Sequence, residues 1–130
     1  IFIFSARLLR RWGAERVLIV ALALFVLRWL FFSIAWSPGV AVAGQALHGV
    51  TFSALWIAGV SYAEQQAPAR LGATAQGLFS GTVYGVSAVG TVAGGVIYAV
   101  AGPAALFQAA AAAVVLALLV FLGAHTAERR

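Results

Sequence analysis

The sequence predicts an all-α membrane protein with four transmembrane helices, and its composition and charge spacing support this prediction. Hydrophobic residues make up 64% of the 130 residues and charged residues only 8%, whereas soluble domains contain about 25% charged residues. Two long stretches, residues 29–63 and 71–127, contain no formally charged side chain. The first stretch together with the apolar residues 17–28, and the second stretch alone, are each long enough to cross a bilayer twice, because one helical crossing takes about 20 residues.

The arginines predict how these helices are oriented. Seven of the eight arginines lie in three groups along the chain: Arg7, Arg10, Arg11 and Arg16; then Arg70; then Arg129 and Arg130. A chain that crosses twice between successive groups keeps every group on one side, and basic residues mark the cytoplasmic side. We therefore expect a multi-pass protein of the cell inner (plasma) membrane with a cytoplasmic C-terminus.

Turn residues divide the apolar sequence into separate helices. We place four transmembrane helices at about residues 17–36, 40–62, 73–100 and 104–122. Proline and glycine at 37–39 end the first helix, and Pro68 stops the second because proline cannot continue a helix. Gly102 and Pro103 separate the third helix from the fourth. Residues 1–4 are apolar but too short to span, and we expect them to be the end of a preceding helix.

The composition argues against several classes of function. The sequence has no cysteine, and His48 and His125 lie far apart without a carboxylate at ligand spacing, so we expect neither a metal ion nor a cofactor. The pI of about 11.2 comes from arginines that flank the helices, which argues against nucleic acid as a partner. The sequence has no nucleophile–base set, paired carboxylates or phosphate loop, so we expect no enzymatic activity.

Glycines recur at fixed spacing in the third predicted helix. They form two Gly-x-x-x-Gly patterns, Gly77, Gly81 and Gly85, and then Gly90 and Gly94. In lipid there is little hydrophobic drive between helices, so close approach of backbones through small residues supplies the packing. We expect these glycines to pack against other helices, the third helix to be central, and the fourth helix to face lipid.

Arg28 and His48 are the polar residues that stand out inside the first two helices. Arg28 is eight residues before Trp36 and His48 is nine residues after Gly39, so both lie about 12 to 14 Å below the outer surface. A cation inside a membrane is a functional candidate. The alternatives are that Arg28 reaches to the interface and that His48 makes an ordinary interhelical hydrogen bond.

His48 belongs to a polar and aromatic stripe on the second helix. Four side chains share this face at spacings of three and four residues: Gln45, His48, Phe52 and Trp56. An amide, an imidazole and two aromatic rings suit a cavity for a small organic molecule, although aromatic filling between helices is the alternative. Polar side chains of the third helix are further candidates for the same cavity: Gln76, Ser80, Tyr84 and Ser87.

Three motifs resemble the C-terminal third of major facilitator superfamily transporters. Residues 7–16 resemble the basic loop between helices eight and nine of that family. Residues 45–52 resemble the Leu-His motif of helix ten in the lactose permease and phenylpropionate transporter branch. Arg28 stands twenty residues before His48, as an arginine of helix nine does in the lactose permease. Residues 73–78 resemble the start of helix eleven in the phenylpropionate group.

The resemblance implies a fold and a function for the whole stretch. The four helices would be helices nine to twelve, and residues 1–130 would be the C-terminal part of one transporter domain, whose partner is the missing N-terminal half. No separate soluble domain is expected. The implied function is proton-coupled symport of a small organic solute across the lipid bilayer, with His48 as the proton-coupling residue. Thr51 replaces a glutamate of the lactose permease, so the proton-transfer role of that glutamate does not carry over.

Arg28 favours an anionic solute, because a buried charge needs a partner. The acids Glu15, Glu64 and Glu128 all belong to the cytoplasmic side of the predicted topology. We therefore expect Arg28 and a neutral His48 to bind a carboxylate, best an aromatic one, unless the missing half supplies an acid. Gln45, Phe52 and Trp56 would complete this substrate site. The alternative is a stand-alone four-helix membrane protein that acts as an oligomeric channel or structural subunit.

Overall fold

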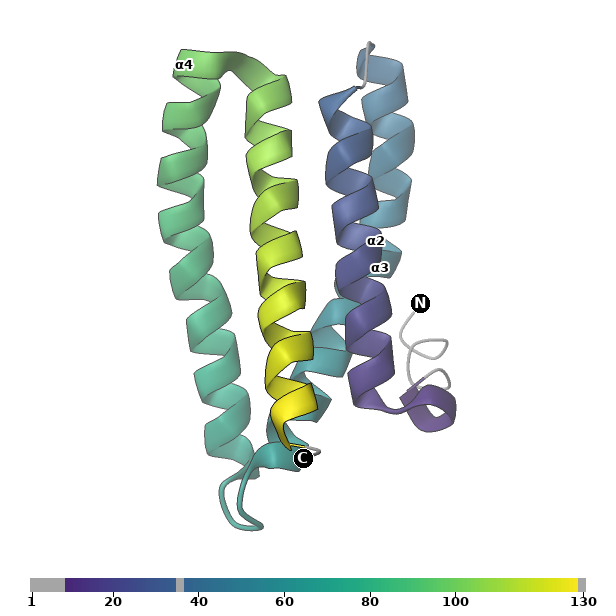
Figure 1. Cartoon of the computed structure of the whole chain (residues 1–130), viewed down its shortest axis with the longest axis vertical. Helices are drawn as coiled ribbons and strands as arrows, with labels where there is room; N and C mark the ends of the chain where they lie inside the picture. The colour runs from purple at the N-terminus through teal and green to yellow at the C-terminus, as the bar shows by residue number, and fades with distance from the viewer. Residues whose placement is uncertain (1–8, 35–36, 129–130) are drawn as a thin grey trace.

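The structure is a computed structural model that describes residues 9–34 and 37–128. Within these residues it is α-helical without strands, and the long helices are α2 (Ala14–Ser33), α3 (Pro38–Gln66) and α4 (Gly72–Glu128) (Figure 1). All three are long and apolar enough to cross a membrane. The prediction of an all-α membrane protein is confirmed. Residues 1–4, Trp36 and the terminal arginines, on which some predictions rest, lie outside the described residues.

Helix α4 is a hairpin of two arms that contains the predicted third and fourth helices. Gly102 interrupts it with φ 82° and ψ 179°, a conformation that side-chain-bearing residues rarely adopt, and Pro103 then begins the second arm. Figure 1 shows the chain reversing direction at this point. The first arm comprises residues 72–101 and the second arm residues 103–128, so four helical segments cross the length of the molecule.

The ends of the helices differ from the sequence-based ranges for local reasons. Helix α2 begins at Ala14 rather than 17, directly after Gly13, whose φ is 80°. Helix α3 begins at Pro38 because the Ser37 hydroxyl accepts a hydrogen bond from the backbone N–H of Val40, at 3.4 Å. Helix α3 ends at Gln66 and the second arm of α4 at Glu128, both beyond the predicted ends at 62 and 122. The polar residues that follow the apolar segments end the hydrophobic pattern but do not end the helix.

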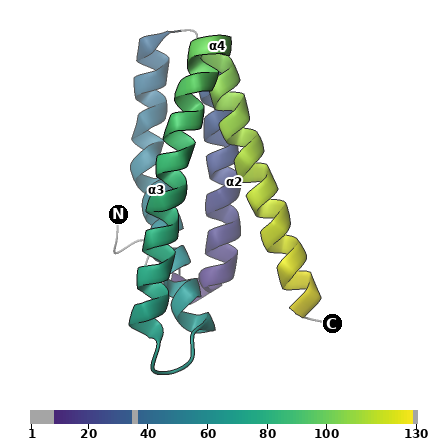
Figure 2. The same cartoon turned by 90° about the vertical axis from the view of Figure 1, so that its left-hand side faces the viewer.

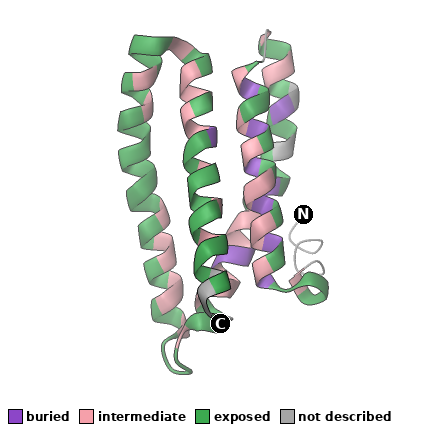
Figure 3. Cartoon of the chain, in the orientation of Figure 1, coloured by how far each residue is buried: buried purple, intermediate pink, exposed green. Residues whose placement is uncertain are grey.

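Most of the buried residues lie on one stripe of α2. They recur every three or four residues along the helix: Ala14, Val17, Ala21, Phe25, Arg28 and Phe32. Figure 3 shows this concentration of buried positions on α2, whereas the first arm of α4 is largely exposed. Helix α2 is therefore the central element of the described chain, and Arg28 lies on its most buried face.

Within the described residues, the arrangement of α4 differs from the sequence-based expectation of which helix is central. The second arm, which we expected to face lipid, contacts α2 through Phe107, and its Ala111 is buried. Its C-terminal end diverges from α2, as Figure 2 shows. The first arm, which we expected to be central, is instead peripheral within the described residues.

The glycines of the first arm have few neighbours among the described residues. A Cβ atom at Gly94 would lie 3.0 Å from Leu106 Cδ1, in the second arm. At the other four positions it would meet nothing within 4 Å: Gly77, Gly81, Gly85 and Gly90. Packing at these four glycines therefore stays a prediction that requires a partner beyond the described residues.

Two glycines of α3 make the close helix contacts instead. A Cβ atom at Gly44 would lie 2.8 Å from Phe31 Cε1, and one at Gly59 would lie 2.7 Å from Phe79 Cε2. Both distances are below van der Waals contact, so neither position accepts a larger side chain without movement of the ring. The absence of a side chain at Gly44 thus lets α3 lie close to α2. The absence of a side chain at Gly59 lets α3 lie close to the first arm of α4.

Candidate functional site

Arg28 is held inside the helix bundle by aromatic rings of its own helix. Only 5% of its surface is exposed. Its Cζ atom lies 4.8 Å from the ring centroid of Phe25, 4.6 Å from Trp29 and 5.7 Å from Phe32, which are cation–π distances. These rings stabilise a guanidinium away from water, and they fix the side chain toward the neighbouring helix α3.

The structure brings Arg28 and His48 together across the α2–α3 contact. Arg28 Nη1 donates a hydrogen bond to His48 Nδ1. An imidazole nitrogen that accepts a hydrogen bond carries no proton, so His48 in this arrangement is neutral with its proton on Nε2. Thr51 is buried one turn further along α3, and its hydroxyl donates to the His48 carbonyl oxygen at 3.2 Å.

No carboxylate pairs with Arg28 among the described residues. Its Nε atom is buried without a hydrogen-bond partner there. Glu15 is thirteen residues away on the same helix, which corresponds to about 20 Å, and Glu64 lies near the same end of the bundle as Glu15. Arg28 is therefore a buried cation whose Nε atom lacks a partner and which no carboxylate neutralises among the described residues.

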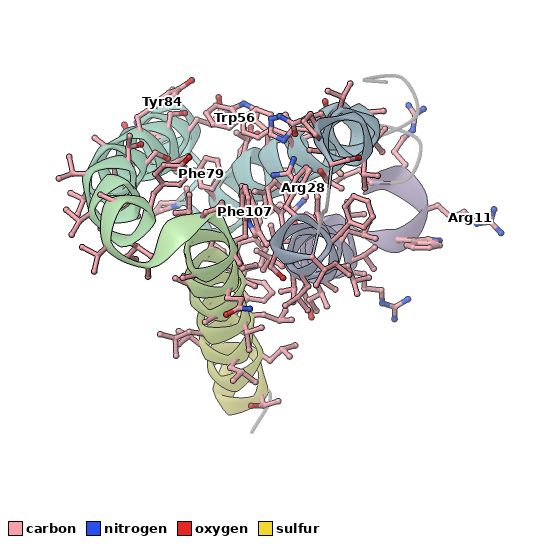
Figure 4. The ribbon with its side chains drawn as sticks, turned by 90° about the horizontal axis from the view of Figure 1, so that it is seen from above. Arg11, Arg28, Trp56, Phe79, Tyr84 and Phe107 are labelled. Carbon is pink, nitrogen blue, oxygen red and sulfur yellow. The ribbon has the colours of Figure 1, made fainter. Side chains whose placement is uncertain are left out.

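A cavity of about 580 Å³ opens next to Arg28. Three polar residues of the predicted site line this cavity: Arg28, His48 and Gln45. The aromatic rings of Trp29 and Phe107 form another part of its wall. Residues of both helix turns at one end of the molecule also line it: Ser37, Pro38, Pro103 and Ala104. Seen from above, Arg28 and Phe107 lie among the helices, whereas Arg11 projects away from them (Figure 4).

Phe52 and Trp56, which we predicted in the same site, do not line this cavity. They continue from His48 along α3 as a row of rings, with centroids 5.5 Å apart for His48 and Phe52 and 5.9 Å apart for Phe52 and Trp56. Trp56 in turn contacts Phe79 and Tyr84 of the first arm of α4, at 5.8 Å and 5.7 Å. The predicted stripe thus divides into a polar part in the cavity and an aromatic part beyond it.

Sequence reasoning missed the aromatic wall of the cavity. Phe107 of the second arm stacks on Trp29 at 5.9 Å with an interplanar angle of 19°, and it contacts Phe32 at 5.5 Å. The spacing of Phe25, Arg28 and Phe32 on one face of α2 is a signal that the sequence contains. No comparable signal marks Phe107, because its position depends on how the second arm is rotated.

Comparison with known proteins places the chain in a family. No solved structure matches the chain. Among the described residues, no three His, Cys, Asp or Glu side chains gather in a way that could hold a metal ion. The model of the MFS_1 like family matches residues 1–109, which include α2, α3 and the contact between Arg28 and His48. The chain therefore belongs to the MFS_1 like family and is a membrane protein of the major facilitator superfamily of transporters.

Proposed function

We propose that this chain is part of a proton-coupled symporter of the inner membrane that carries an aromatic or other carboxylic acid. The observation that supports this proposal most is the buried Arg28, which has a free Nε donor and no acidic partner among the described residues. An unpaired buried ion costs several kcal/mol, so a bound anion would stabilise this arrangement. A carboxylate suits the planar guanidinium, which can donate to both of its oxygens.

The cavity beside Arg28 has a lining suited to an aromatic acid. The carboxylate would meet Arg28, and the His48 Nε2–H or the Gln45 amide could donate a further hydrogen bond. The ring would lie against Trp29 and Phe107, which stack on each other at the wall of the cavity. This chemistry favours the phenylpropionate resemblance over the sugar-transporting one.

His48 provides a physical basis for coupling the solute to a proton. Protonation of Nδ1 would remove the acceptor of the Arg28 hydrogen bond and would place a second positive charge beside the first. An anion bound between the two residues compensates for both charges. Binding of proton and binding of anion therefore reinforce each other, and by linkage this coupling is reciprocal.

Transport itself would require more than these helices. In transporters of this architecture the solute site lies near the midplane between two half-bundles that rock around it. The cavity here is bounded by residues of both turns at one end, the end that we assign to the outside. The missing N-terminal half would supply the other wall of the site.

Uptake measurements in the intact transporter test this proposal. Replacing Arg28 by Gln should reduce uptake of an aromatic acid by roughly 100-fold, since the anion would lose its charged partner in a buried site. Arg28→Lys should retain part of the activity, and His48→Asn should bind solute but lose its dependence on a proton gradient. Arg11→Gln is the matched control, because Arg11 is exposed and points away from the bundle. Normal uptake by Arg28→Gln would refute the proposal.

A further inference from the structure

The cavity beside Arg28 has a further polar side chain in its wall, closer to the outer turn. Ser33 is the last residue of α2, and it lines the cavity together with Arg28. It follows Arg28 by five residues, which corresponds to about 7.5 Å along the helix axis toward the turn at 37–39. A single carboxylate is too small to reach both residues. Ser33 therefore belongs to a second polar part of the cavity.

The residues of α2 line the cavity in a definite chemical order. The cation Arg28 comes first, and the rings of Trp29 and Phe32 follow. Ser33 comes last, nearest to the outer turn. Phe107 of the second arm of α4 contacts both rings, at 5.9 Å and 5.5 Å, and widens the aromatic wall between the two polar ends. A solute that fits this order has a carboxylate at one end, a ring in the middle and a polar group at the other end.

Helix α3 contributes a polar side chain to the same part of the cavity. Gln45 lines the cavity and precedes His48 by three residues, so it lies about 4.5 Å closer to the outer turn. Side chains of a helix lean toward its N-terminus, and α3 starts at the outer turn, so the Gln45 amide extends outward (Figure 1). Helix α2 runs in the opposite direction, and the same rule directs Ser33 inward. The two side chains therefore converge on one level of the cavity.

The hydrogen bonds of these two side chains determine which solute group they can bind. The Ser33 hydroxyl donates its only hydrogen to the Leu30 carbonyl oxygen at 2.7 Å, so Ser33 Oγ can only accept from a solute. The Gln45 amide makes no hydrogen bond to any described residue, so its NH₂ group is available as a donor. A hydroxyl group both donates and accepts, whereas an ether or carbonyl oxygen only accepts. The pair therefore matches a hydroxyl group.

The depth of Gln45 makes a partner for its amide necessary. Gln45 follows Pro38, the first residue of α3, by seven residues, which corresponds to about 10 Å. Hydrocarbon offers an amide no hydrogen bond at such a depth, and an amide without one is unfavourable. The neighbouring residues Ala41 and Val42 in the cavity wall are apolar, so they supply no side-chain partner. A polar group of a bound solute would satisfy this amide.

We infer that Ser33 and Gln45 form a hydroxyl subsite, and that the solute is an aromatic acid with a hydroxyl group on its ring, opposite the carboxylate. This inference rests on the proposed function, since it concerns the far end of the acid whose carboxylate Arg28 would bind. The solute hydroxyl donates to Ser33 Oγ and accepts from the Gln45 amide, while the His48 Nε2–H serves the carboxylate. Ordinary bond lengths place the para hydroxyl oxygen of a 3-arylpropionate about 8 Å from its carboxylate carbon, close to the spacing of Arg28 and Ser33.

Binding of two acids that differ only in the ring hydroxyl tests this inference. The purified intact transporter should bind 3-(4-hydroxyphenyl)propionate about threefold to tenfold more tightly than 3-phenylpropionate, as one neutral hydrogen bond contributes. This preference should disappear in Ser33→Ala and in Gln45→Leu, because each variant removes a partner of the hydroxyl. Equal Kd values in the unaltered protein, or an undiminished preference in either variant, would overturn the inference.

Matched substitutions control for indirect effects on packing. Ser33→Thr keeps a hydroxyl at the same position and should retain the preference for the hydroxylated acid. Ser53→Ala removes a hydroxyl of α3 that does not line the cavity, and Gln65→Leu replaces an exposed amide near the other end of α3. Both should retain the preference as well. Loss of the preference in these two controls would show that it does not depend on hydrogen bonds in the cavity, and the inference would be wrong.

The hydroxyl subsite and the carboxylate site can fail separately in these experiments. If the protein prefers 3-phenylpropionate to its neutral amide and Arg28→Gln loses this preference, the carboxylate site stands. Equal binding of the hydroxylated and the unsubstituted acid would then refute the hydroxyl subsite alone. If the intact protein binds neither acid, or Arg28→Gln binds both as tightly as the unaltered protein, the proposed function is refuted and the hydroxyl subsite with it.

Discussion

At the scale of single residues, Arg28 is a cation buried among aromatic rings. Its helix buries a regular stripe of small and aromatic residues, and the arginine occupies one position in that stripe. Cation–π contacts with Phe25, Trp29 and Phe32 offset part of the cost of burial, but they leave its Nε atom without a partner among the described residues. A cation inside a membrane helix is a candidate for function, and the proposal that Arg28 binds an anion starts from this observation.

The pairing of Arg28 with His48 could be anticipated, whereas the residues that surround it could not. Counting residues from the shared turn gives equal depths in two regular antiparallel helices, and this count requires no knowledge of helix rotation. Phe107 comes from a segment that is not adjacent in sequence to α2 or α3. Its place against Trp29 depends on the angle of the second arm of α4, which no pattern in the sequence encodes.

Gly59 gives a residue-scale prediction about packing. Replacing Gly59 by Ala should lower the stability of the protein by about 1–3 kcal/mol, because the new methyl group would overlap the ring of Phe79. Gly95→Ala is the control, since a Cβ atom there would meet nothing within 4 Å. The melting temperature of the detergent-solubilised protein measures the effect. If both variants melt at the same temperature, Phe79 does not fit against Gly59.

At the scale of helices, the sequence predicted which segments form but not how they pack. The turns at 37–39 and at Gly102 and Pro103 are marked by proline and glycine, so the four segments were identified with only their ends displaced. The Gly-x-x-x-Gly patterns predict close packing without naming the partner, and most of these glycines have no neighbour among the described residues. Gly44 and Gly59 have no such pattern around them, and therefore they were missed.

The hairpin of α4 gives a prediction at this scale. Gly102 has φ 82° and ψ 179°, a backbone region that costs other residues about 1–3 kcal/mol. Replacing Gly102 by Ala should therefore destabilise the turn and lower the melting temperature. Gly123→Ala, at an open helical position of the second arm, should leave the melting temperature unchanged or raise it slightly. Equal melting temperatures for Gly102→Ala and the unaltered protein would show that this turn tolerates a side chain.

At the scale of the whole molecule, the helix bundle has two different ends. The turns that line the cavity lie at one end, and the connection between α3 and α4 lies at the other (Figure 1). There the Gln76 amide donates to Glu64 at 3.1 Å, which joins the two helices near the connection. The distribution of arginines predicts that the end with the α3–α4 connection faces the cytoplasm. This orientation stays a prediction.

Labelling of single cysteines tests this topology. Ser37→Cys should react with a membrane-impermeant thiol reagent added outside intact cells, because the turn at 37–39 is predicted to face outward. Gln66→Cys, in the exposed end of α3, should react only after the cells are opened. Labelling of position 66 and protection of position 37 in intact cells would reverse the orientation and, with it, the direction in which the cavity opens.

Binding by the purified intact transporter tests the central proposal, that Arg28 recognises a carboxylate, most directly. The measurement compares the Kd of an aromatic acid with the Kd of the corresponding neutral amide, which has nearly the same shape. The unaltered protein should prefer the acid by at least roughly tenfold, the value of a charge-assisted hydrogen bond, and Arg28→Gln should bind the two ligands equally. Equal binding of both ligands by the unaltered protein, or an undiminished preference for the acid in Arg28→Gln, would contradict the account.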